Sequence, residues 1–437
     1  MELKRQINLR DAVIINLGAI IGAGIFVIIG LAAGLTGSSI TLSIVIAALI
    51  SILTGLSFGY LALFISKEGG SYEYAKEALS PYAGFIAGIA WALGNSIALA
   101  AVSLSTGSYI DALLGLHISD LYIAIADIIA FTIINLLGLK NSTKSLTILV
   151  SLNILVLIIF VLAGLTHISL SNLSSFVVNG VNGIFAATAV IFFAFTGFSR
   201  VTTLSEEVID PENTIPKAII YSIIISSLIY FAVTFVAVGL APYYKLASSK
   251  SPLSLAISVT GLKILYLIIS LGGVTATAGV TLTGILGVSR VLFAMSRDRI
   301  LPKKLSYIND RGIPPYAILA TSAVALIFLI FLKFSSIVDA ANLGVLTSYL
   351  IVNIAALYAS IKERRAAKGI YGSKRFYIIP LIGAASIVFI AAYLEKSAIT
   401  IIVSLLILAT FYYIFLIEER KIKKIPRFIE IRDLKTS

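Results

Sequence analysis

Long apolar stretches alternate with short polar segments along the whole chain. A helix that crosses a bilayer needs roughly 20 mostly apolar residues, and the pattern contains about twelve such stretches. They cover residues 12–35, 40–65, 83–110, 121–139, 146–166, 184–204, 218–241, 264–289, 316–333, 337–361, 376–393 and 398–417. The pattern therefore predicts an all-α integral membrane protein with about twelve transmembrane helices and no separate soluble domain.

The composition supports a membrane protein and excludes several kinds of functional site. Of the 437 residues, 59% are hydrophobic and 12% are charged, whereas a soluble protein carries about 25% charged residues. There is no cysteine, and the two histidines are His117 and His167. These counts exclude a disulfide framework, a thiolate metal site and a cysteine nucleophile. We expect no metal, no cofactor and no enzymatic activity.

The basic residues gather on alternate loops. If the N-terminus is cytoplasmic, 28 of the 33 Lys and Arg residues fall on inner segments and 5 on outer loops, in agreement with the positive-inside rule. This predicts a multi-pass protein of the cell membrane with both termini in the cytoplasm. The net charge of +12 then reflects topology and attraction to anionic lipid, not nucleic-acid binding. For the basic tail from Arg420 onward, a regulatory partner is the alternative.

Two of the predicted helices contain sequences that weaken a helix at mid-membrane depth. The first holds Gly18, Gly22 and Gly24, and the sixth holds the segment Phe193–Phe198 with Gly197 in it. A packing face of small residues is the alternative explanation for the glycines. These helices open corresponding five-helix halves that enter the bilayer from opposite sides, so the interruptions meet near the midplane, as in inverted-repeat transporters. We expect repeats over 1–166 and 167–361, followed by two peripheral helices and the tail over 362–437.

An interrupted helix exposes backbone groups that suit a particular ligand. Free N–H groups at the start of a half-helix carry the positive end of its dipole and favour a carboxylate. Free carbonyl groups at the end of the other half favour an ammonium group. An α-amino acid carries both groups on one carbon, and the interruptions therefore predict an amino acid as the ligand.

Several motifs resemble those of the amino acid-polyamine-organocation (APC) superfamily of permeases. The motifs are Gly18–Phe26, Glu68–Tyr72, Phe193–Phe198, Glu206–Pro211, Ile215–Ala218 and Ser289–Pro302. They occur in the family's order from about residue 8 to 360. The resemblance implies a 5+5 inverted-repeat fold with discontinuous helices 1 and 6, and alternating access without ATP.

The resemblance also implies roles for individual positions. The substrate carboxylate would meet the backbone N–H groups of Ala23 and Gly24, with Gly22 permitting the turn. The α-amino group would meet the carbonyl groups of Ile20, Phe193 and Thr196, next to Gly197. Phe193 would also close the outward path as an aromatic gate, unless it is only a packing residue. Asn95 would face the substrate, unless it is an interhelical hydrogen-bonding residue.

Two departures from the family limit the analogy. Several relatives have a lysine midway along helix 5, but no Lys or Arg lies between Lys144 and Arg200 here, which argues against a lysine proton switch. A sodium site is the other option, built from helix 1 carbonyls and the hydroxyls of Thr275, Thr277 or Thr281, although threonines in membrane helices often bond their own backbone. Arg299 replaces the usual glycine in the loop after helix 8.

The few ionisable residues within the predicted helices are functional candidates. Asp127 either carries a proton or, the interpretation we favour, is a neutral acid bonded to a neighbouring helix. Arg200 either pairs with Asp11, Glu206 or Glu207 as a cytoplasmic gate or extends toward the inner interface. Asp339 is either a gate residue or a cap.

Helices 1, 3 and 8 carry no charge at mid-depth, which predicts an uncharged substrate side chain. We therefore expect secondary active transport of a neutral L-amino acid, coupled to H⁺ or Na⁺ or proceeding by exchange. An amine or polyamine permease of the same fold and a non-transporting amino acid sensor are the alternatives. An intramembrane enzyme would need a clustered nucleophile or metal ligands, which the sequence lacks.

Overall fold

The computed structural model describes residues 5–22, 24–115, 118–138, 142–362 and 369–422. Ala23, His117 and the basic residues from 423 onward, for which the sequence makes predictions, lie outside this part of the chain. Within it the chain is helical, and the single β-bridge joins Ile7 to Val208.

The α-helices are α1 (Leu9–Ile20), α2 (Ile29–Thr36), α3 (Ile40–Ala62), α4 (Ser71–Ala78), α5 (Pro81–Leu114), α6 (Asp120–Leu137), α7 (Ser142–Leu165), α8 (Leu170–Leu173), α9 (Gly180–Phe192), α10 (Pro211–Leu240), α11 (Tyr243–Ser248), α12 (Pro252–Ser258), α13 (Lys263–Arg297), α14 (Pro315–Phe331), α15 (Phe334–Lys362), α16 (Ile378–Ala391) and α17 (Lys396–Ile422). A π-helical turn, η1, spans Gly24–Ile28. The 3-10 helices are η2 (Gly37–Ser39), η3 (Phe193–Glu207), η4 (Lys303–Ser306) and η5 (Gly369–Gly372).

The helices confirm the predicted class. In the described part of the chain, nine helical segments are long and apolar enough to cross a membrane, and α14 and α16 are shorter apolar helices. One of the nine, Leu9–Ala62, contains the predicted stretch 12–35 and most of the stretch 40–65. Each predicted apolar stretch overlaps a helix, while the exact number of crossings stays a prediction.

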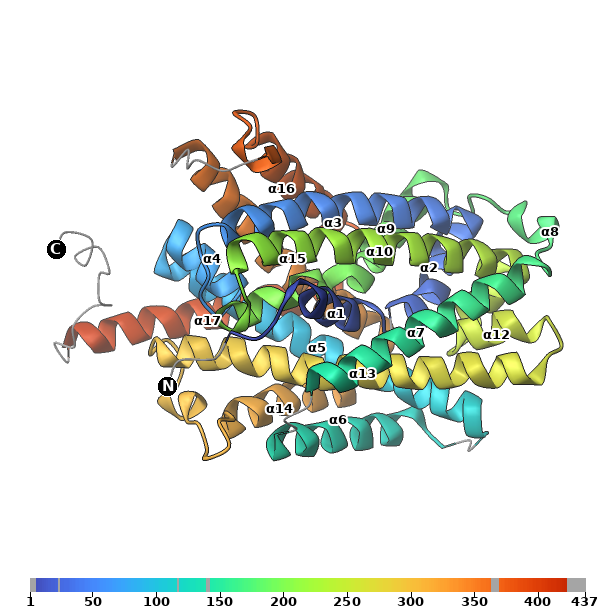
Figure 1. The fold of residues 1–437 in the computed structure, drawn as a ribbon, viewed down its shortest axis with the longest axis horizontal. Coiled ribbons are helices and arrows are strands. Elements are labelled where there is room, and N and C mark those ends of the chain that lie inside the picture. Colours follow the sequence, from blue (N-terminus) through green and yellow to red (C-terminus); the bar gives the residue numbers. More distant parts are fainter. Residues whose placement is uncertain (1–4, 23, 116–117, 139–141, 363–368, 423–437) are drawn as a thin grey trace.

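The longest helices lie side by side along the long axis of the molecule (Figure 1), with α5 packed against both α13 and α15. Glycine allows the close approach of α5 and α15. A Cβ added to Gly344 would lie 2.8 Å from the Cα atom of Gly94, so the two backbones touch, as small residues permit in membrane bundles. This contact fixes the centre of the bundle around which the other helices pack.

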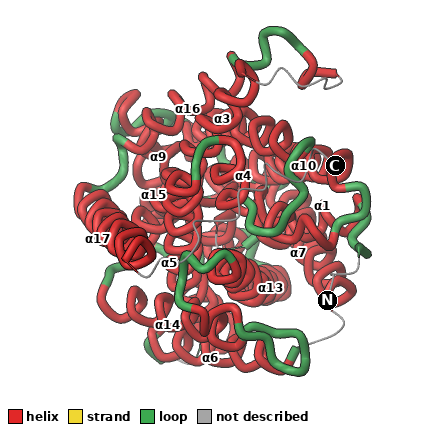
Figure 2. Tube along the Cα trace, turned by 90° about the vertical axis from the view of Figure 1, so that its left-hand side faces the viewer, coloured by secondary structure: helices red, strands yellow, loops and turns green. Residues whose placement is uncertain are grey.

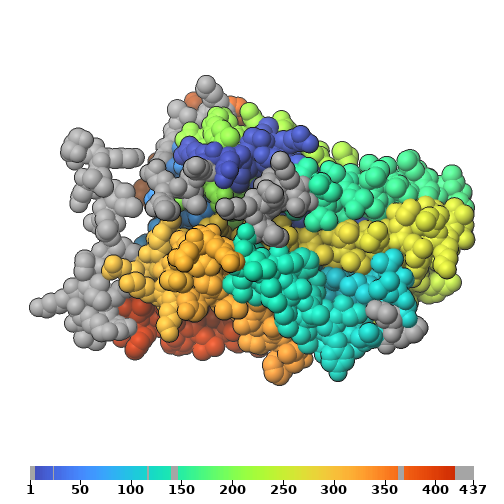
Figure 3. Space-filling view, turned by 60° about the horizontal axis from the view of Figure 1, so that its bottom comes forward, coloured from blue at the N-terminus to red at the C-terminus, as the bar shows by residue number. Residues whose placement is uncertain are grey.

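The outer helices keep apolar side chains on the surface. In Figure 2, α17 and α6 lie at the periphery of the bundle, and only 11% and 17% of their most apolar windows are buried, against 78% for α5. On α7, Ile148, Leu155 and Leu162 are exposed, and α6 and α7 form part of the surface in Figure 3. Apolar side chains of this kind suit contact with lipid tails.

Candidate functional site

The first helix is interrupted where its glycines predict. Helix α1 ends at Ile20, and Ile21 has an extended backbone (φ −78°, ψ 97°). The chain becomes helical again at Gly24, in the π-helical turn η1. Backbone groups at residues 21 and 22 therefore lie at a helix interruption inside the protein, where both residues are buried.

The sixth predicted helix behaves differently from the prediction. It does not unwind between Phe193 and Phe198 but tightens from α9 into the 3-10 helix η3, and its dihedral angles leave the helical range only at Leu204 (φ −120°, ψ 22°). Hydroxyl groups explain the tightening, because each bonds the carbonyl three residues earlier instead of leaving it free. The four donors are Thr196, Thr202, Thr203 and Ser205. A 3-10 run of this length is uncommon and is typical of a functional hinge.

The two irregular segments touch backbone to backbone. A Cβ added to Gly24 would lie 2.4 Å from the Cβ atom of Ala194, and one added to Gly197 would lie 2.4 Å from the carbonyl carbon of Ala19. Real Cβ atoms do not come this close to other atoms. Both glycines are therefore required for packing, and the packing and binding explanations of the glycine run do not exclude each other.

Two buried tyrosines hold this junction, and the sequence analysis did not single them out. The Tyr230 hydroxyl on α10 donates to the Ile20 carbonyl at 2.7 Å and faces the Ala194 carbonyl at 3.3 Å, so it bridges the two segments. The Tyr349 hydroxyl on α15 donates to the Thr196 carbonyl. Their signal in the sequence is a tyrosine inside an apolar helix, whose hydroxyl needs a partner when buried.

A small cavity opens at the junction, and part of it is open to solvent. The predicted residues that line it are Ile20, Gly22, Gly24, Asn95, Phe193, Thr196, Gly197 and Arg200. Apolar residues of α5 and α13, including Leu99, Val102 and Val280, form another part of the wall. All the predicted substrate-binding positions within the described ranges thus come together at one cavity.

The carbonyl groups predicted to bind the α-amino group already accept protein hydrogen bonds. The Ile20 and Thr196 carbonyls accept from the tyrosines, and the Phe193 carbonyl accepts from the Thr196 hydroxyl at 2.9 Å. A carbonyl oxygen has two lone pairs, so each can accept a second bond. The Asn95 side chain both faces the cavity and donates to the Trp91 carbonyl at 2.9 Å.

The three threonines of the possible ion site do not line this cavity. Thr275 donates to Asn153 at 2.8 Å, and Thr277 accepts from Thr106 at 2.9 Å. The Thr281 hydroxyl donates to Asp127 at 3.1 Å. Each hydroxyl points to a different neighbouring helix, and the sodium site stays a prediction.

Asp127 joins three helices. One of its carboxyl oxygens accepts from Ser103 on α5 at 2.7 Å and from Thr281 on α13. This matches the favoured interpretation of a side chain that is bonded to neighbouring helices. Asp339 accepts from the backbone N–H of Glu395 at 2.9 Å and so acts as a cap at the start of α17.

Of the two alternatives for Arg200, the ion pair with Asp11, Glu206 or Glu207 is not seen among the described residues. Arg200 is buried, with 5% of the residue exposed, and is part of the cavity wall. Its guanidinium group donates to Asn95 at 3.1 Å and lies 5.1 Å from the Trp91 ring centroid. Sequence position alone does not tell which face of a helix a side chain occupies, and here it turns away from the carboxylates. Two of the three acids named as its possible partners pair with other arginines: Glu206 pairs with Arg297 at 3.5 Å and Glu207 with Arg290 at 3.8 Å.

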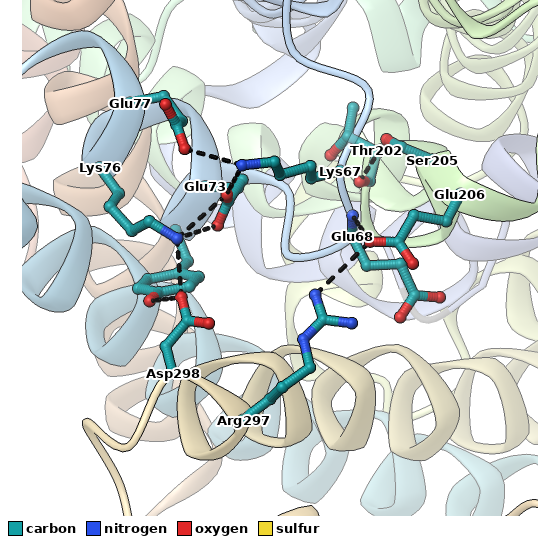
Figure 4. Close-up of polar contacts among 11 residues, drawn as sticks. Lys67, Glu68, Glu73, Lys76, Glu77, Thr202, Ser205, Glu206, Arg297 and Asp298 are labelled. Carbon is teal, nitrogen blue, oxygen red and sulfur yellow. Dashed lines mark hydrogen bonds and ion pairs between the residues drawn. The ribbon is translucent and has the colours of Figure 1, made fainter. Parts of the chain in front are cut away.

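These ion pairs belong to a larger charged network at one end of the bundle, which we call the charged end. Figure 4 shows the part of it that includes Lys76, Glu206 and Arg297. It joins the α3–α4 loop, α4, η3 and α13 through the side chains of Lys67, Glu68, Glu73, Lys76, Glu77, Glu206, Glu207, Arg290, Arg297 and Asp298. Lys76 contacts both Glu73 at 2.9 Å and Asp298 at 2.7 Å. The backbone N–H of Glu68 donates to Glu206 at 3.1 Å.

The Glu68 side chain is the exceptional member of the charged end. It is fully buried, and its carboxyl oxygens have no hydrogen-bond partner within the described residues. Burial raises the pKa of this carboxyl to about 7, although Arg290 opposes the increase. The neighbouring turn needs its glycines, because Gly69 and Gly70 have positive φ angles of 123° and 52°. Sequence analysis identified the turn but not the network that it carries.

A bundle of apolar helices around a small cavity at a helix interruption defines a membrane protein that binds a small solute in its interior. Sequence comparison gives the family. The chain belongs to the amino acid permease family, whose pattern matches residues 7–416. The family consists of transporters, which agrees with the resemblance to APC permeases.

Individual relatives cover most of the chain. It is 32% identical to an uncharacterized transporter of Mycobacterium tuberculosis over 91% of this chain and 88% of that one. It is 30% identical to the branched-chain amino acid permease BcaP of Bacillus subtilis, over 83% and 82% of the two chains. Cationic amino acid transporter 1 of Arabidopsis thaliana is 27% identical over 82% of this chain and 63% of its own length.

Proposed function

We propose that this protein is a secondary active transporter that moves an amino acid across the cell membrane by alternating access. The observation that carries the proposal is the cavity at the contact between the interrupted α1 and the 3-10 helix η3. The family supplies the solute class, and the backbone groups at the interruption suit the two charges that every amino acid zwitterion carries.

In the proposed binding mode the carboxylate lies at the start of η1 near Gly24, where N–H groups begin a new helical turn. The ammonium group lies near the carbonyl groups of Ile20, Phe193 and Thr196. Phe193 is buried in the cavity wall, and an aromatic ring there suits a gate because it closes a path without burying a polar group.

We further propose twelve crossings, with inverted repeats over residues 1–166 and 167–361 and both termini in the cytoplasm. In this topology the charged end is the cytoplasmic side, and its ion pairs between α4, η3 and α13 close that side. Opening the cavity to the cytoplasm would require the Arg297–Glu206 and Lys76–Asp298 pairs to separate. Coupling to H⁺ or Na⁺, or exchange of one amino acid for another, supplies the driving force.

The proposed substrates are amino acids without a cationic side chain, which includes the neutral class predicted from sequence. Relatives are named for different substrates: BcaP for branched-chain amino acids and the Arabidopsis transporter for cationic amino acids. Arg200 in the cavity wall disfavours a cationic side chain and a polyamine, because like charges repel strongly in a low-dielectric site. No acidic residue within the described ranges lines the cavity to offset this repulsion.

The experiment is uptake of labelled amino acids into proteoliposomes, with proton and sodium gradients imposed separately. Uptake or exchange of at least one amino acid is expected, and the gradient that stimulates it identifies the coupling ion. Absence of uptake and exchange for every amino acid would reject the function. Binding without uptake would favour the sensor instead.

A further inference from the structure

The cavity wall contains a buried positive charge without a negative partner. The Arg200 side chain is 95% buried, and no carboxylate within the described ranges forms an ion pair with it. The guanidinium group contacts the Asn95 amide oxygen and the face of the Trp91 ring, and both groups are uncharged. Arginine does not lose its proton in proteins, so the charge persists in every state of the cavity.

Part of the guanidinium group is also buried without a hydrogen-bond partner. The Nε and Nη1 atoms have no hydrogen-bond partner within the described part of the chain. A buried charge that lacks a partner is strongly destabilising, and so are unsatisfied donors. The nearby acids of the charged end do not compensate, since Glu206 and Glu207 are paired with other arginines.

The surrounding helices leave space for this group. A Cβ added to Gly287 on α13 would lie 2.2 Å from the Arg200 Nη1 atom and 2.9 Å from its Cδ atom. The absent side chain on α13, the Asn95 amide and the Trp91 ring on α5 together set the position of the guanidinium group. Three separate residues therefore hold the guanidinium group of Arg200, a residue of the cavity wall.

We propose that Arg200 forms an anion subsite of the cavity and that it binds the side-chain carboxylate of an acidic amino acid. The α-carboxylate would remain at the start of η1. This inference rests on the proposed function and narrows its substrate class from non-cationic to acidic amino acids. Charge-assisted hydrogen bonds between arginine and carboxylate are among the stronger contacts in proteins, and this one forms in a site largely withdrawn from water.

The test compares acids with their amides, which have nearly the same shape. Binding of glutamate, aspartate, glutamine, asparagine and leucine is measured by ligand-induced thermal stabilisation of the purified full-length protein. Glutamate or aspartate is expected to bind about 10- to 100-fold more tightly than the matching amide, the range that one charged hydrogen bond provides. Equal affinity for acid and amide would overturn the proposal without any mutation.

Variants then locate the preference. In Arg200→Gln, the ratio of acid affinity to amide affinity is expected to fall by about 10- to 100-fold. Gly287→Ala keeps the charge but displaces the flexible end of Arg200, so it should lower the same ratio while the protein remains folded. Gly279→Ala is the matched control, because a Cβ there meets no atom within 4 Å. An unchanged ratio in both test variants would refute the subsite.

Two further binding results would contradict the proposed subsite. If Arg200→Gln lowers the affinities for glutamate, glutamine and leucine by the same factor, the guanidinium group binds the α-carboxylate and the proposed role is wrong. If replacing chloride by gluconate in the buffer abolishes wild-type binding of all the amino acids, the subsite holds an inorganic anion and the proposal also fails. Because these measurements report binding, a lack of uptake in proteoliposomes would reject transport separately.

Discussion

The two irregular segments that meet at the cavity reach their geometry in different ways. At Ile21 and Gly22 the first helix is truly interrupted, whereas between Phe193 and Glu207 the chain stays helical and narrows to a 3-10 helix. The first segment depends on glycine to turn and to approach its neighbour. The second depends on hydroxyl groups that bond its own carbonyls. A paired site in a transporter therefore does not require two identical interruptions.

The largest expected effect comes from filling the contact between the segments. Gly197→Ala and Gly24→Val should abolish amino acid binding and lower the unfolding temperature, because the added atoms meet the backbones of Ala19 and Ala194. Overpacking of this kind costs about 1–3 kcal/mol or more. Thermal unfolding and ligand binding in detergent check both effects, with Gly279→Ala as the control.

That control has its own expected result. Gly279 lies within α13 and has open space around it, so alanine should leave binding unchanged and stabilise the helix by at most about 1 kcal/mol. A folded Gly197→Ala or Gly24→Val protein with unchanged affinity would show that close contact at the junction is not needed for binding.

The next effect concerns the far end of η3, where it meets Glu68. This carboxyl has a pKa near 7 in the folded state and near 4.5 when unfolded, so the folded state retains a proton that the unfolded state has lost. Stability should therefore fall as pH rises from about 4.5 to 7, and Glu68→Gln should remove this loss. The gain of the variant above pH 7 is at most about 3 kcal/mol, from 1.36 kcal/mol per pKa unit.

Unfolding in detergent from pH 4 to 8 measures this difference. Glu77→Gln provides a comparison, since Glu77 is a partly exposed carboxylate of the same network that pairs with Lys67. Parallel pH curves for wild type and Glu68→Gln would contradict the expected titration and show that the pKa of Glu68 is the same in the folded and unfolded states.

A smaller effect separates the two segments directly. Tyr230→Phe removes the donor that bridges both segments, while Tyr349→Phe removes a donor that serves only η3. Each loss should cost about 1–3 kcal/mol, because a buried carbonyl loses a partner. We expect Tyr230→Phe to weaken amino acid binding more than Tyr349→Phe at similar loss of stability. The reverse order would indicate that η3 alone forms the site.

The smallest expected effect is the loss of one hydroxyl from η3. Thr203→Val removes the bond from the Thr203 hydroxyl to the Arg200 carbonyl at 2.8 Å and should cost about 1 kcal/mol or less, with binding retained. Thermal unfolding measures it. A complete loss of binding would mean that the 3-10 geometry depends on a single hydroxyl and not on the series.

Sequence patterns predicted the features that depend on local chemistry. Apolar length located the helices, and the spacing of Gly18, Gly22 and Gly24 located the first interruption. The cavity residues followed from the family resemblance, and all of those within the described ranges line one space. The sixth predicted helix was expected to unwind between Phe193 and Phe198, but this segment is a 3-10 helix. The reason is that hydroxyl groups bond its backbone carbonyls, which competes with unwinding.

Features that depend on which way a helix turns were not predictable. Apolar residues are spread almost evenly around helices such as α5 and α13. The pattern therefore indicates how far along the helix a residue lies, but not which neighbouring helix its side chain faces. The sequence therefore left the contacts of Arg200 open between two alternatives, and the hydroxyls of Thr275, Thr277 and Thr281 could not be assigned to their partners. The contacts of Tyr230 and Tyr349 connect residues more than 100 positions apart, which no single-sequence pattern encodes.

The Tyr230 hydroxyl has only one hydrogen to give, yet two main-chain oxygens compete for it. If α1 and η3 move apart, the Tyr230 hydroxyl can keep its hydrogen bond to only one of these two oxygens. The hydroxyl therefore has two alternative bonded positions. Its vibrational frequency should differ between the two positions, which makes this one side chain an internal reporter of the transport cycle.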